Sequence, residues 1–179
     1  MPEINYSLRI IKGYPTPNVQ FIDINTLLAE PEYFTKAIDK MCQTIQQTLE
    51  PEALKNTAII TPESRGFLFA APVAYRLGIP FLPIRKKGKI PNKPYCFHIT
   101  NEYDSYDVEM DEELLLSFPH FIYIDDILAT GQTLSSVRKA IAAKGKEILL
   151  AVHLTSVKSL QTMRDDNPEL KDLPHKEIL

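Results

Sequence analysis

The stretch Phe121-Ile-Tyr-Ile-Asp-Asp-Ile-Leu-Ala-Thr-Gly-Gln-Thr-Leu134 decides the fold class of this chain. It begins with an apolar run of β-branched and aromatic residues, which is typical of a buried strand. Two adjacent carboxylates, Asp125 and Asp126, follow this run, and a turn of small residues comes after them. A helix is predicted next, because apolar residues recur at helical spacing, at Leu134, Val137 and Ile141. The order strand, turn and helix is the repeating unit of a parallel α/β sheet.

The turn and the carboxylates have a chemical interpretation and a structural one. A helix N-terminus presents unpaired N–H groups and a partial positive charge, so a turn that leads into it can hold a phosphate. Asp125 and Asp126 stand where open α/β sheets bind ligands, and they suit sugar hydroxyls or a hard cation such as Mg²⁺. The structural alternative is ordinary turn chemistry, because Asp and Thr-Gly are common in turns and at helix entries. Neither Gly-Lys-Ser/Thr nor G-x-G-x-x-G follows the strand, which excludes a Walker A loop and a dinucleotide fingerprint.

Composition limits the class of protein. The chain has 179 residues, 44% of them hydrophobic and 24% charged, which suits one globular domain over residues 1–179. The formal net charge of −3 argues against a nucleic-acid-binding protein that works through bulk positive charge. The N-terminus lacks a signal-peptide pattern, and the most apolar stretch carries Arg76 and prolines, so we expect no membrane span. Cys42 and Cys96 are expected to be reduced thiols, which fits a cytoplasmic location.

Segments on both sides of the central stretch complete an α/β pattern. Buried-type strands are predicted at 57–61, 80–84 and 147–153, and helices at 31–49, 68–77 and 133–144. We therefore expect a mostly parallel, twisted sheet flanked by helices. Alternating residues at 95–100 and 106–110 predict a hairpin, the core of a flexible β flap at 86–110. At the chain ends, we expect a short helix and turn before Pro17, and a polar tail without a final strand from Asp165.

Charged loops follow two of the predicted strands. Glu63-Ser-Arg-Gly-Phe67 leads into an apolar helix, and Arg85-Lys-Lys-Gly-Lys-Ile-Pro91 follows the next strand. Both loops fit a position on the solvated surface. The first would then hold a Glu63–Arg65 salt bridge that stabilises the fold by about 1 kcal/mol or less, and the second would be an exposed basic turn. Both also suit anion sites, since cations concentrated in an acidic protein attract negative ligands locally. His153, on a buried strand, is interpreted as a core residue with satisfied hydrogen bonds.

The central stretch resembles a motif of the type I phosphoribosyltransferases. That family binds phosphoribosyl diphosphate (PRPP) with it, and the form Asp-Asp-x-Leu-Ala-Thr-Gly-x-Thr is similar to that of adenine phosphoribosyltransferases. The resemblance implies that Asp125 and Asp126 bind the ribose hydroxyls. It also implies that the turn binds the 5′-phosphate, through Ala129, Thr130, Gly131, Gln132 and Thr133. At Gln132 the chain departs from the family, which usually has a second Gly there.

The two charged loops resemble the same family. Glu63 to Phe67 is similar to its Glu-Ala-Arg-Gly-Phe segment, and Arg85 to Pro91 is similar to its Arg-Lys-x-Gly-Lys-Leu-Pro strip. The resemblance implies that cations bind the leaving diphosphate, namely Arg65, Arg85, Lys86 and Lys89. It also implies a catalytic role for Arg65.

Two further segments imply a base site. Residues 15–24 resemble the family's Pro-x-Pro-Gly-x-x-Phe-x-Asp-Ile pattern, which belongs to a hood over the purine, here residues 1–30. The resemblance implies that Phe21 stacks on the base and that main-chain groups near Gln20 and Ile22 bind the edge of the base. Without the resemblance, Phe21 is interpreted as an ordinary core aromatic residue. In the flap, Glu102-Tyr103 is what remains of the family's Tyr-Ser-Leu-Glu-Tyr-Gly. The resemblance makes Glu102 the acid/base group and places Tyr103 at the base, whereas Glu102 by itself suits an exposed surface position.

The resemblance implies transfer of the phosphoribosyl group of PRPP to adenine, which gives AMP and diphosphate in purine salvage. It implies Mg²⁺ as cofactor, with no certain direct protein ligand and with Asp125 and Asp126 as candidates, directly or through the ribose. It also implies a homodimer. Two alternatives stay open: transfer to hypoxanthine, guanine, xanthine or a pyrimidine, because the flap is divergent, or a non-catalytic PRPP-sensing regulator of the same fold. Such regulators usually carry a DNA-binding module, and the sequence shows no sign of one.

Overall fold

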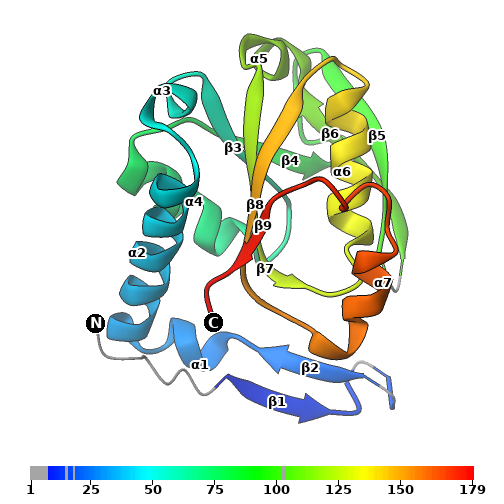
Figure 1. Cartoon of the computed structure of the whole chain (residues 1–179). Helices are drawn as coiled ribbons and strands as arrows, with labels where there is room; N and C mark the ends of the chain where they lie inside the picture. Colours follow the sequence, from blue (N-terminus) through cyan, green and yellow to red (C-terminus); the bar gives the residue numbers. More distant parts are fainter. Residues whose placement is uncertain (1–7, 15, 18, 102–103) are drawn as a thin grey trace.

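A mostly parallel sheet with β7 near its centre forms the framework of the molecule. The computed structural model describes residues 8–14, 16–17, 19–101 and 104–179. Within them, the central sheet has the strand order β5-β6-β4-β3-β7-β8-β9 (Figure 1). The strands are Thr57–Pro62 (β3), Phe81–Lys86 (β4), Pro94–Thr100 (β5), Ser105–Asp111 (β6), His120–Leu128 (β7), Glu147–Ser156 (β8) and His175–Glu177 (β9). All neighbouring pairs from β4 to β9 are parallel, whereas β6 pairs antiparallel with both β4 and β5.

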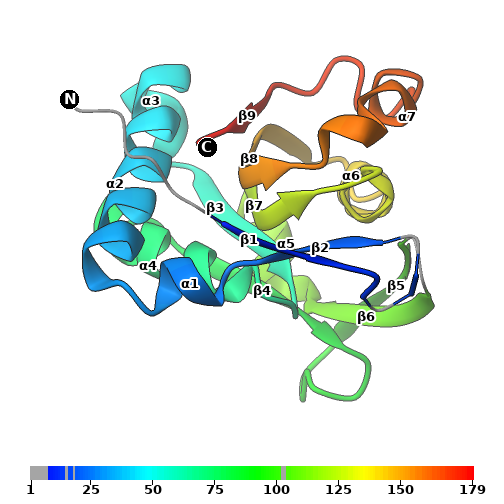
Figure 2. The same cartoon turned by 90° about the horizontal axis from the view of Figure 1, so that it is seen from below.

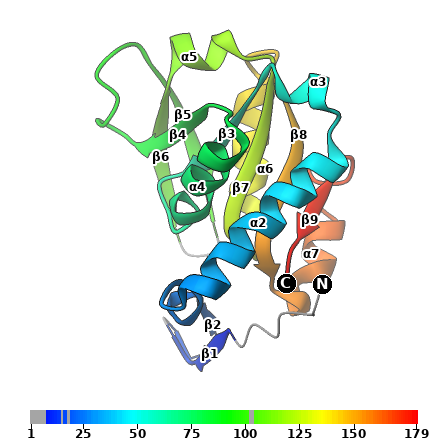
Figure 3. The same ribbon diagram turned by 90° about the vertical axis from the view of Figure 1, so that its left-hand side faces the viewer.

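Helices cover both faces of this sheet. They are Asn25–Leu28 (α1), Pro31–Thr48 (α2), Pro51–Leu54 (α3), Phe67–Leu77 (α4), Glu112–Ser117 (α5), Gln132–Ala142 (α6), the 3₁₀ turn Lys158–Leu160 (η1) and Gln161–Asp165 (α7). Figure 3 shows α2 and α4 on the near face of the sheet and α6 on the far face. The α/β fold with a mostly parallel sheet that the sequence predicts is therefore confirmed.

The alternation of side chains along β7 divides the core into two layers. Ile122 and Ile124 pack with the buried residues of α2 and α4, such as Met41. The intervening side chains of Phe121 and Tyr123 pack on the other face, with the inner residues of α6. β7 is thus buried on both faces, as a central parallel strand must be.

The carboxyl ends of β3 and β7 meet at the point where the strand order reverses. β3 runs through α4 to β4 on one side of the sheet, and β7 runs through α6 to β8 on the other side. The loop after β3 begins at Glu63, and the end of β7 carries Asp125 and Asp126. Open α/β sheets bind ligands in the crevice at such a switch point. The fold therefore brings these two loops together at the expected binding edge.

A separate two-stranded ribbon lies next to this edge. Arg9–Lys12 (β1) pairs antiparallel with Gln20–Asp23 (β2), so the helix expected before Pro17 is wrong. Asp23 accepts hydrogen bonds from Arg9 Nε (2.8 Å) and from the N–H of Asn25 (2.9 Å), which tie the ribbon to α1. Figure 2, seen from below, shows the ribbon crossing under the sheet. The described part of the hood segment is therefore a hairpin beside the carboxyl ends of the strands, followed by the short helix α1.

Other expectations from the sequence have mixed outcomes. The hairpin predicted in the flap is confirmed as β5 and β6, which pair from Pro94–Asp111 to Thr100–Ser105. The expected absence of a final strand is wrong, because β9 pairs in parallel with β8. Among the described residues, none of the helices is both long enough and apolar enough to cross a membrane.

Candidate active site

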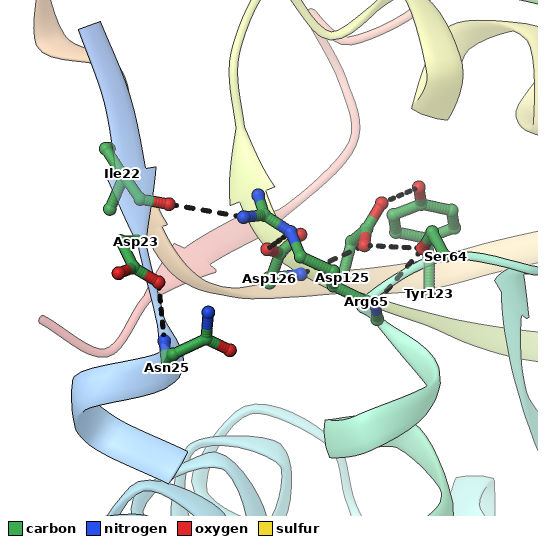
Figure 4. A network of polar contacts seen from close by, with 9 residues as sticks. Ile22, Asp23, Asn25, Ser64, Arg65, Tyr123, Asp125 and Asp126 are labelled. Carbon is green, nitrogen blue, oxygen red and sulfur yellow. Dashed lines mark hydrogen bonds and ion pairs between the residues drawn. The ribbon is translucent and has the colours of Figure 1, made fainter. Parts of the chain in front are cut away.

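Asp125 is held by donors from three directions. The hydroxyl of Tyr123 donates to its Oδ2 (2.9 Å), and the hydroxyl of Ser64 donates to its Oδ1 (3.2 Å). The backbone N–H of Asp126 also donates to Oδ1 (3.0 Å), as Figure 4 shows for this group of residues. Because strand β7 and the loop after β3 both contribute donors, the carboxylate has a fixed orientation.

The two carboxylates influence each other's ionisation. Burial, and second the charge of Asp126, raise the pKa of Asp125 to about 7. Burial also raises the pKa of Asp126, although the positive charge of Arg65 opposes this rise. Near neutral pH the pair therefore carries less than two full negative charges. A ligand that brings hydroxyl donors or a cation would favour full ionisation.

Gly66 allows the loop after β3 to lie directly on Asp125. A Cβ atom at this position would stand 2.5 Å from Asp125 Oδ1 and 2.6 Å from Thr61 Oγ1, closer than real side chains approach. The N–H of Gly66 donates to the hydroxyl of Ser64 (3.1 Å), which in turn donates to Asp125. Close contact with the carboxylate thus explains why glycine occupies position 66.

Arg65 joins the carboxylate pair to the hood. Its Nε lies 2.7 Å from Oδ2 of Asp126, an ion pair that is not aligned as a hydrogen bond. Its Nη1 donates to the carbonyl of Ile22 (3.2 Å; Figure 4). Its guanidinium carbon lies 5.0 Å from the centre of the Phe21 ring. The guanidinium is therefore in contact with the sugar-binding candidates and the base-binding candidates at once.

A cavity of about 310 Å³ lies between these elements. Its walls come from the hood, the loop after β3, the end of β7 with the turn that follows, and the residue after β8, namely Tyr14, Val19, Gln20, Phe21, Ile22, Arg65, Asp126, Ile127, Ala129 and Val157. Tyr14 stands edge-on to Phe21, with ring centres 5.2 Å apart. The volume lies within the range of small-molecule sites, and an aromatic wall faces a carboxylate across it. The arrangement suits a planar base joined to a polar sugar.

A smaller cavity of about 50 Å³ lies at the turn between β7 and α6. Ala129, Gly131 and Thr133 line it from the turn, and Tyr123, Asp125 and His153 line it from the sheet. Gly131 has φ +82°, and no side chain caps α6, which starts at the next residue. The N–H of Gln132 donates to Oγ1 of Thr130 (3.4 Å), whereas the next N–H groups of α6, at Thr133 and Leu134, have no partner within the helix and can bind an anion.

The basic strip lies apart from both cavities. Arg85 Nε donates to Glu63 Oε2 (3.0 Å), which also accepts from the N–H of Lys86 (3.1 Å), and these bonds hold the pKa of Glu63 below its usual range. The N–H groups of Lys89 and Ile90 both donate to Glu109 Oε1. Arg85, Lys86 and Lys89 line neither cavity. The remaining candidates, Glu102 and Tyr103, lie outside the described residues.

The structure adds contacts that sequence reasoning missed. Ser64 and Tyr123 donate to Asp125, and Tyr123 could have been found, because residues two apart on a strand share a face. His153 is buried as expected, but its Nδ1 has no hydrogen-bond partner among the described residues. The interpretation of His153 as a satisfied core residue is therefore wrong. Burial lowers the pKa of His153 to about 3, so its ring is neutral.

Comparison with known proteins gives one consistent result. A family model described as "Phosphoribosyl transferase domain" matches residues 24–173. The adenine phosphoribosyltransferase of Clostridium acetobutylicum is 35% identical over 159 residues, which cover 88% of this chain and 88% of that protein. That of Desulfitobacterium hafniense is 36% identical over 141 residues, which cover 79% of this chain and 78% of the relative.

Solved structures resemble the chain over nearly its whole length. Adenine phosphoribosyltransferase from Thermoanaerobacter pseudethanolicus has a TM-score of 0.81 at 29% identity, covering 96% of this chain and 94% of the other. The enzyme from Saccharomyces cerevisiae, solved with an imino-altritol bisphosphate and adenine, has a TM-score of 0.81 at 26% identity with the same coverage.

Proposed function

Because the chain belongs to the phosphoribosyltransferase family, we propose that it transfers the phosphoribosyl group of PRPP to adenine. The products are AMP and diphosphate, so the chain acts in purine salvage. Its fold is the type I phosphoribosyltransferase fold that the sequence predicts. Its curated relatives at about one-third identity are adenine phosphoribosyltransferases.

One observation supports this proposal above the others. The cavity of about 310 Å³ is lined jointly by Phe21 of the hood, Arg65 of the loop after β3 and Asp126 of β7. Three segments that are distant in the sequence therefore face one space, in which a base, a sugar and a charged leaving group can lie side by side. A protein that bound only a sugar phosphate would need no aromatic hood on this side of the carboxylates.

We assign the 5′-phosphate and the ribose of PRPP to two parts of the β7–α6 unit, the turn before α6 and the carboxyl end of β7. The 5′-phosphate binds to the N–H groups and hydroxyls of the turn 129–133, where the helix dipole also favours an anion. The ribose hydroxyls donate to Asp125 and Asp126. Adenine stacks against Phe21, and main-chain groups near Gln20 and Ile22 bind its edge, with Tyr103 of the flap close to the base.

The proposed reaction is a substitution at the anomeric carbon. The bond from C1 of the ribose to the diphosphate oxygen breaks, and its electron pair leaves with the diphosphate. The bond from C1 to N9 of adenine forms, and the N9 proton passes to Glu102. Arg65 stabilises the negative charge on the leaving group, and one such preorganised contact typically contributes about 3–4 kcal/mol.

The cations of the basic strip complete the diphosphate site in this proposal. Lys86 and Lys89 begin the flap at 86–110 and Arg85 directly precedes it; closure of the flap over the site would bring these cations to the diphosphate and exclude water. In the structure Arg85 is paired with Glu63 and Arg65 with Asp126. Both arginines therefore have a carboxylate partner that the diphosphate must share or replace.

Mg²⁺ is the cofactor that this chemistry requires. Among the described residues, no group of three or more His, Cys, Asp or Glu side chains could hold a metal by itself. Asp125 and Asp126 nevertheless provide carboxylate oxygens of the kind that Mg²⁺ prefers, and a Mg²⁺ ion usually keeps few protein ligands when phosphates bind it. When bound with PRPP, the ion would neutralise charge on the diphosphate. We further propose that the chain acts as a homodimer in the cytoplasm.

The test is an assay of diphosphate release with purified protein, Mg²⁺, PRPP and one base at a time. We expect release with adenine, with AMP formed in equal amount. Release with hypoxanthine, guanine, xanthine or a pyrimidine instead of adenine would reassign the base. No release with any base, together with measurable binding of PRPP, would support a PRPP-sensing regulator and contradict the proposal.

A further inference from the structure

A buried arginine from the C-terminal part of the chain lies behind the turn that precedes α6. Arg164, on α7, is 5% exposed. Its Nη1 donates to the carbonyls of Ala129 (2.8 Å), Val157 (2.9 Å) and Leu128 (3.4 Å). Its Nη2 donates to the hydroxyl of Ser156 (3.4 Å). One guanidinium thus binds the end of β7, the first residue of the turn and the end of β8.

Among the residues that the structure describes, the charge of Arg164 has no carboxylate partner. Within the described residues, no Asp or Glu forms an ion pair with it, and its acceptors are carbonyls and a hydroxyl. A buried charge is costly unless an opposite charge or a set of hydrogen bonds compensates it. The carbonyls accept from Nη1 and the Ser156 hydroxyl accepts from Nη2, but these neutral acceptors leave the net positive charge. An anion bound at the turn would supply the missing negative charge.

The contacts of Arg164 also orient the peptide groups of the turn. In a trans peptide the carbonyl and the N–H point in opposite directions. The carbonyls of Leu128 and Ala129 point toward Arg164, so the N–H groups of Ala129 and Thr130 point away from it. These are the first N–H groups of the turn proposed to hold the 5′-phosphate. Arg164 therefore fixes the side of the turn on which an anion can bind.

Residues that follow Arg164 in the chain pack against the same turn. A Cβ atom at Gly131 would stand 2.3 Å from Leu170 Cδ1, so Leu170 packs directly against the turn. Arg138 of α6 donates to the carbonyl of Glu169. Figure 2 shows α7 beside α6. The C-terminal segment 164–170 is thus a support for the turn and the helix that follows it.

The charge of Arg164 reaches the cavity on the other side of the turn. His153 lines that cavity of about 50 Å³ together with Gly131 and Thr133. Burial, the charge of His175 and the charge of Arg164 lower the pKa of His153 to about 3. Arg164 is therefore close enough to act on a charged group in the cavity. The same positive charge that disfavours a protonated His153 would attract an anion there.

We propose that Arg164 is a positioning residue for the 5′-phosphate of the substrate. It acts through the backbone of the turn, and its uncompensated charge favours the phosphate dianion without touching it. This inference rests on the proposed function, because it assumes that a 5′-phosphate binds at the turn.

The experiment compares a phosphorylated ligand with its unphosphorylated counterpart. The dissociation constants of AMP and adenosine are measured by calorimetry for the wild type, Arg164→Met and Arg164→Lys. Arg138→Met is the matched control, because it removes a guanidinium-to-carbonyl contact of the same segment without touching the carbonyls of the turn. Circular dichroism and thermal unfolding show which variants are folded.

For Arg164→Met we expect the dissociation constant of AMP to rise about tenfold or more, since tenfold corresponds to about 1.4 kcal/mol. The dissociation constant of adenosine should change less than twofold. Arg164→Lys keeps the positive charge but loses the planar guanidinium that contacts several carbonyls at once. The dissociation constant of AMP should therefore rise about threefold, which is less than in Arg164→Met. Arg138→Met should bind AMP as the wild type does.

Equal weakening of AMP and adenosine in a folded Arg164→Met, or no weakening of AMP, would overturn the inference. If Arg164→Met does not fold, the same comparison of AMP with adenosine is made for Arg164→Lys. Unchanged binding of AMP, or an equal loss of affinity for both ligands, would then overturn the inference. A wild type that binds neither AMP nor PRPP would contradict the proposed function itself. The two failures are therefore distinguishable.

Discussion

Replacing Tyr123 with Phe removes one hydroxyl from the site and keeps the ring that fills the core. That hydroxyl donates a 2.9 Å hydrogen bond to Oδ2 of Asp125. Tyr123 is 1% exposed, so the remaining ring stays packed in the core when the hydroxyl is removed. A donor stabilises an ionised carboxylate more than a protonated one. Loss of this donor therefore raises the pKa of Asp125.

The size of the effect follows from the strength of the bond. A hydrogen bond to a charged group contributes about 1.5–3 kcal/mol, and about 1.4 kcal/mol corresponds to one pH unit. The pKa of Asp125 is already about 7, first because of burial and second because of the charge of Asp126. In Tyr123→Phe we expect it to lie roughly one to two pH units higher. At pH 7 the ionised fraction of Asp125 then falls from about one half to about 1–10%.

The assay is the pH dependence of kcat/KM for PRPP, followed from about pH 5.5 to 9.5. If ionised Asp125 accepts the ribose hydroxyls, kcat/KM rises with pH and levels off above the pKa of this group in the free enzyme. The variant should be about 5- to 50-fold less active at neutral pH and should regain most of its activity at the alkaline end. The phosphate groups of PRPP titrate in the same way for both proteins, so the difference between the curves reports the enzyme.

Tyr95→Phe is the control for the loss of a tyrosine hydroxyl. The hydroxyl of Tyr95 donates to the carbonyl of Ala140 (3.0 Å), near the end of α6 that is remote from the turn. This variant should keep the wild-type profile. An unchanged profile in a folded Tyr123→Phe, or a loss of activity that is equal at every pH, would refute the reasoning.

Other variants test separate parts of the site. Asp125→Asn combined with Asp126→Asn should lower turnover at least about a hundredfold while thermal unfolding shows a folded protein, since sugar-positioning contacts act mainly in the transition state; near-normal turnover would end the PRPP-site assignment. Phe21→Ala should raise the KM for adenine about tenfold and leave the KM for PRPP nearly unchanged, because stacking contributes roughly 1–3 kcal/mol per base; equal changes in both KM values would contradict the stacking role. Gly66→Ala should destabilise the protein by about 1–3 kcal/mol and abolish most activity, because its Cβ would stand 2.5 Å from Asp125 Oδ1; unchanged activity and denaturation midpoint would show that the loop does not need this contact.

The β7–α6 unit could be predicted from the sequence because its signals are local. The apolar run from Phe121 to Ile124 and the helical spacing after Thr133 do not depend on distant residues. The strand at the N-terminus could not be predicted in this way. Ile10 is 57% exposed, and β1 exists because it pairs with β2, so burial leaves no pattern in the sequence. The same is true of β9, whose residues are polar and exposed and which forms by hydrogen bonds to β8.

Some residues of the candidate site could likewise be proposed from the sequence, and others could not. The residues that carry family motifs could be proposed from the sequence, and the structure places Phe21, Arg65 and Asp126 around one cavity. The role of Arg164 could not be proposed, because its acceptors at Leu128 and Ala129 are 35 or more residues away and are backbone atoms. A backbone acceptor has no side-chain signal, so only the tertiary structure shows the contact.

The two adjacent carboxylates have different tasks, and the strand geometry explains why. Successive side chains of a strand point to opposite faces. Asp125 therefore meets Tyr123 and the loop after β3, whose hydroxyls are part of the fixed framework. Asp126 meets Arg65, a long side chain that also contacts the hood and is partly exposed. If a diphosphate binds as proposed and attracts Arg65, Asp126 would lose its cation and could accept a ribose hydroxyl, whereas Asp125 would keep its donors. Substrate binding should therefore change the surroundings of Asp126 more than those of Asp125.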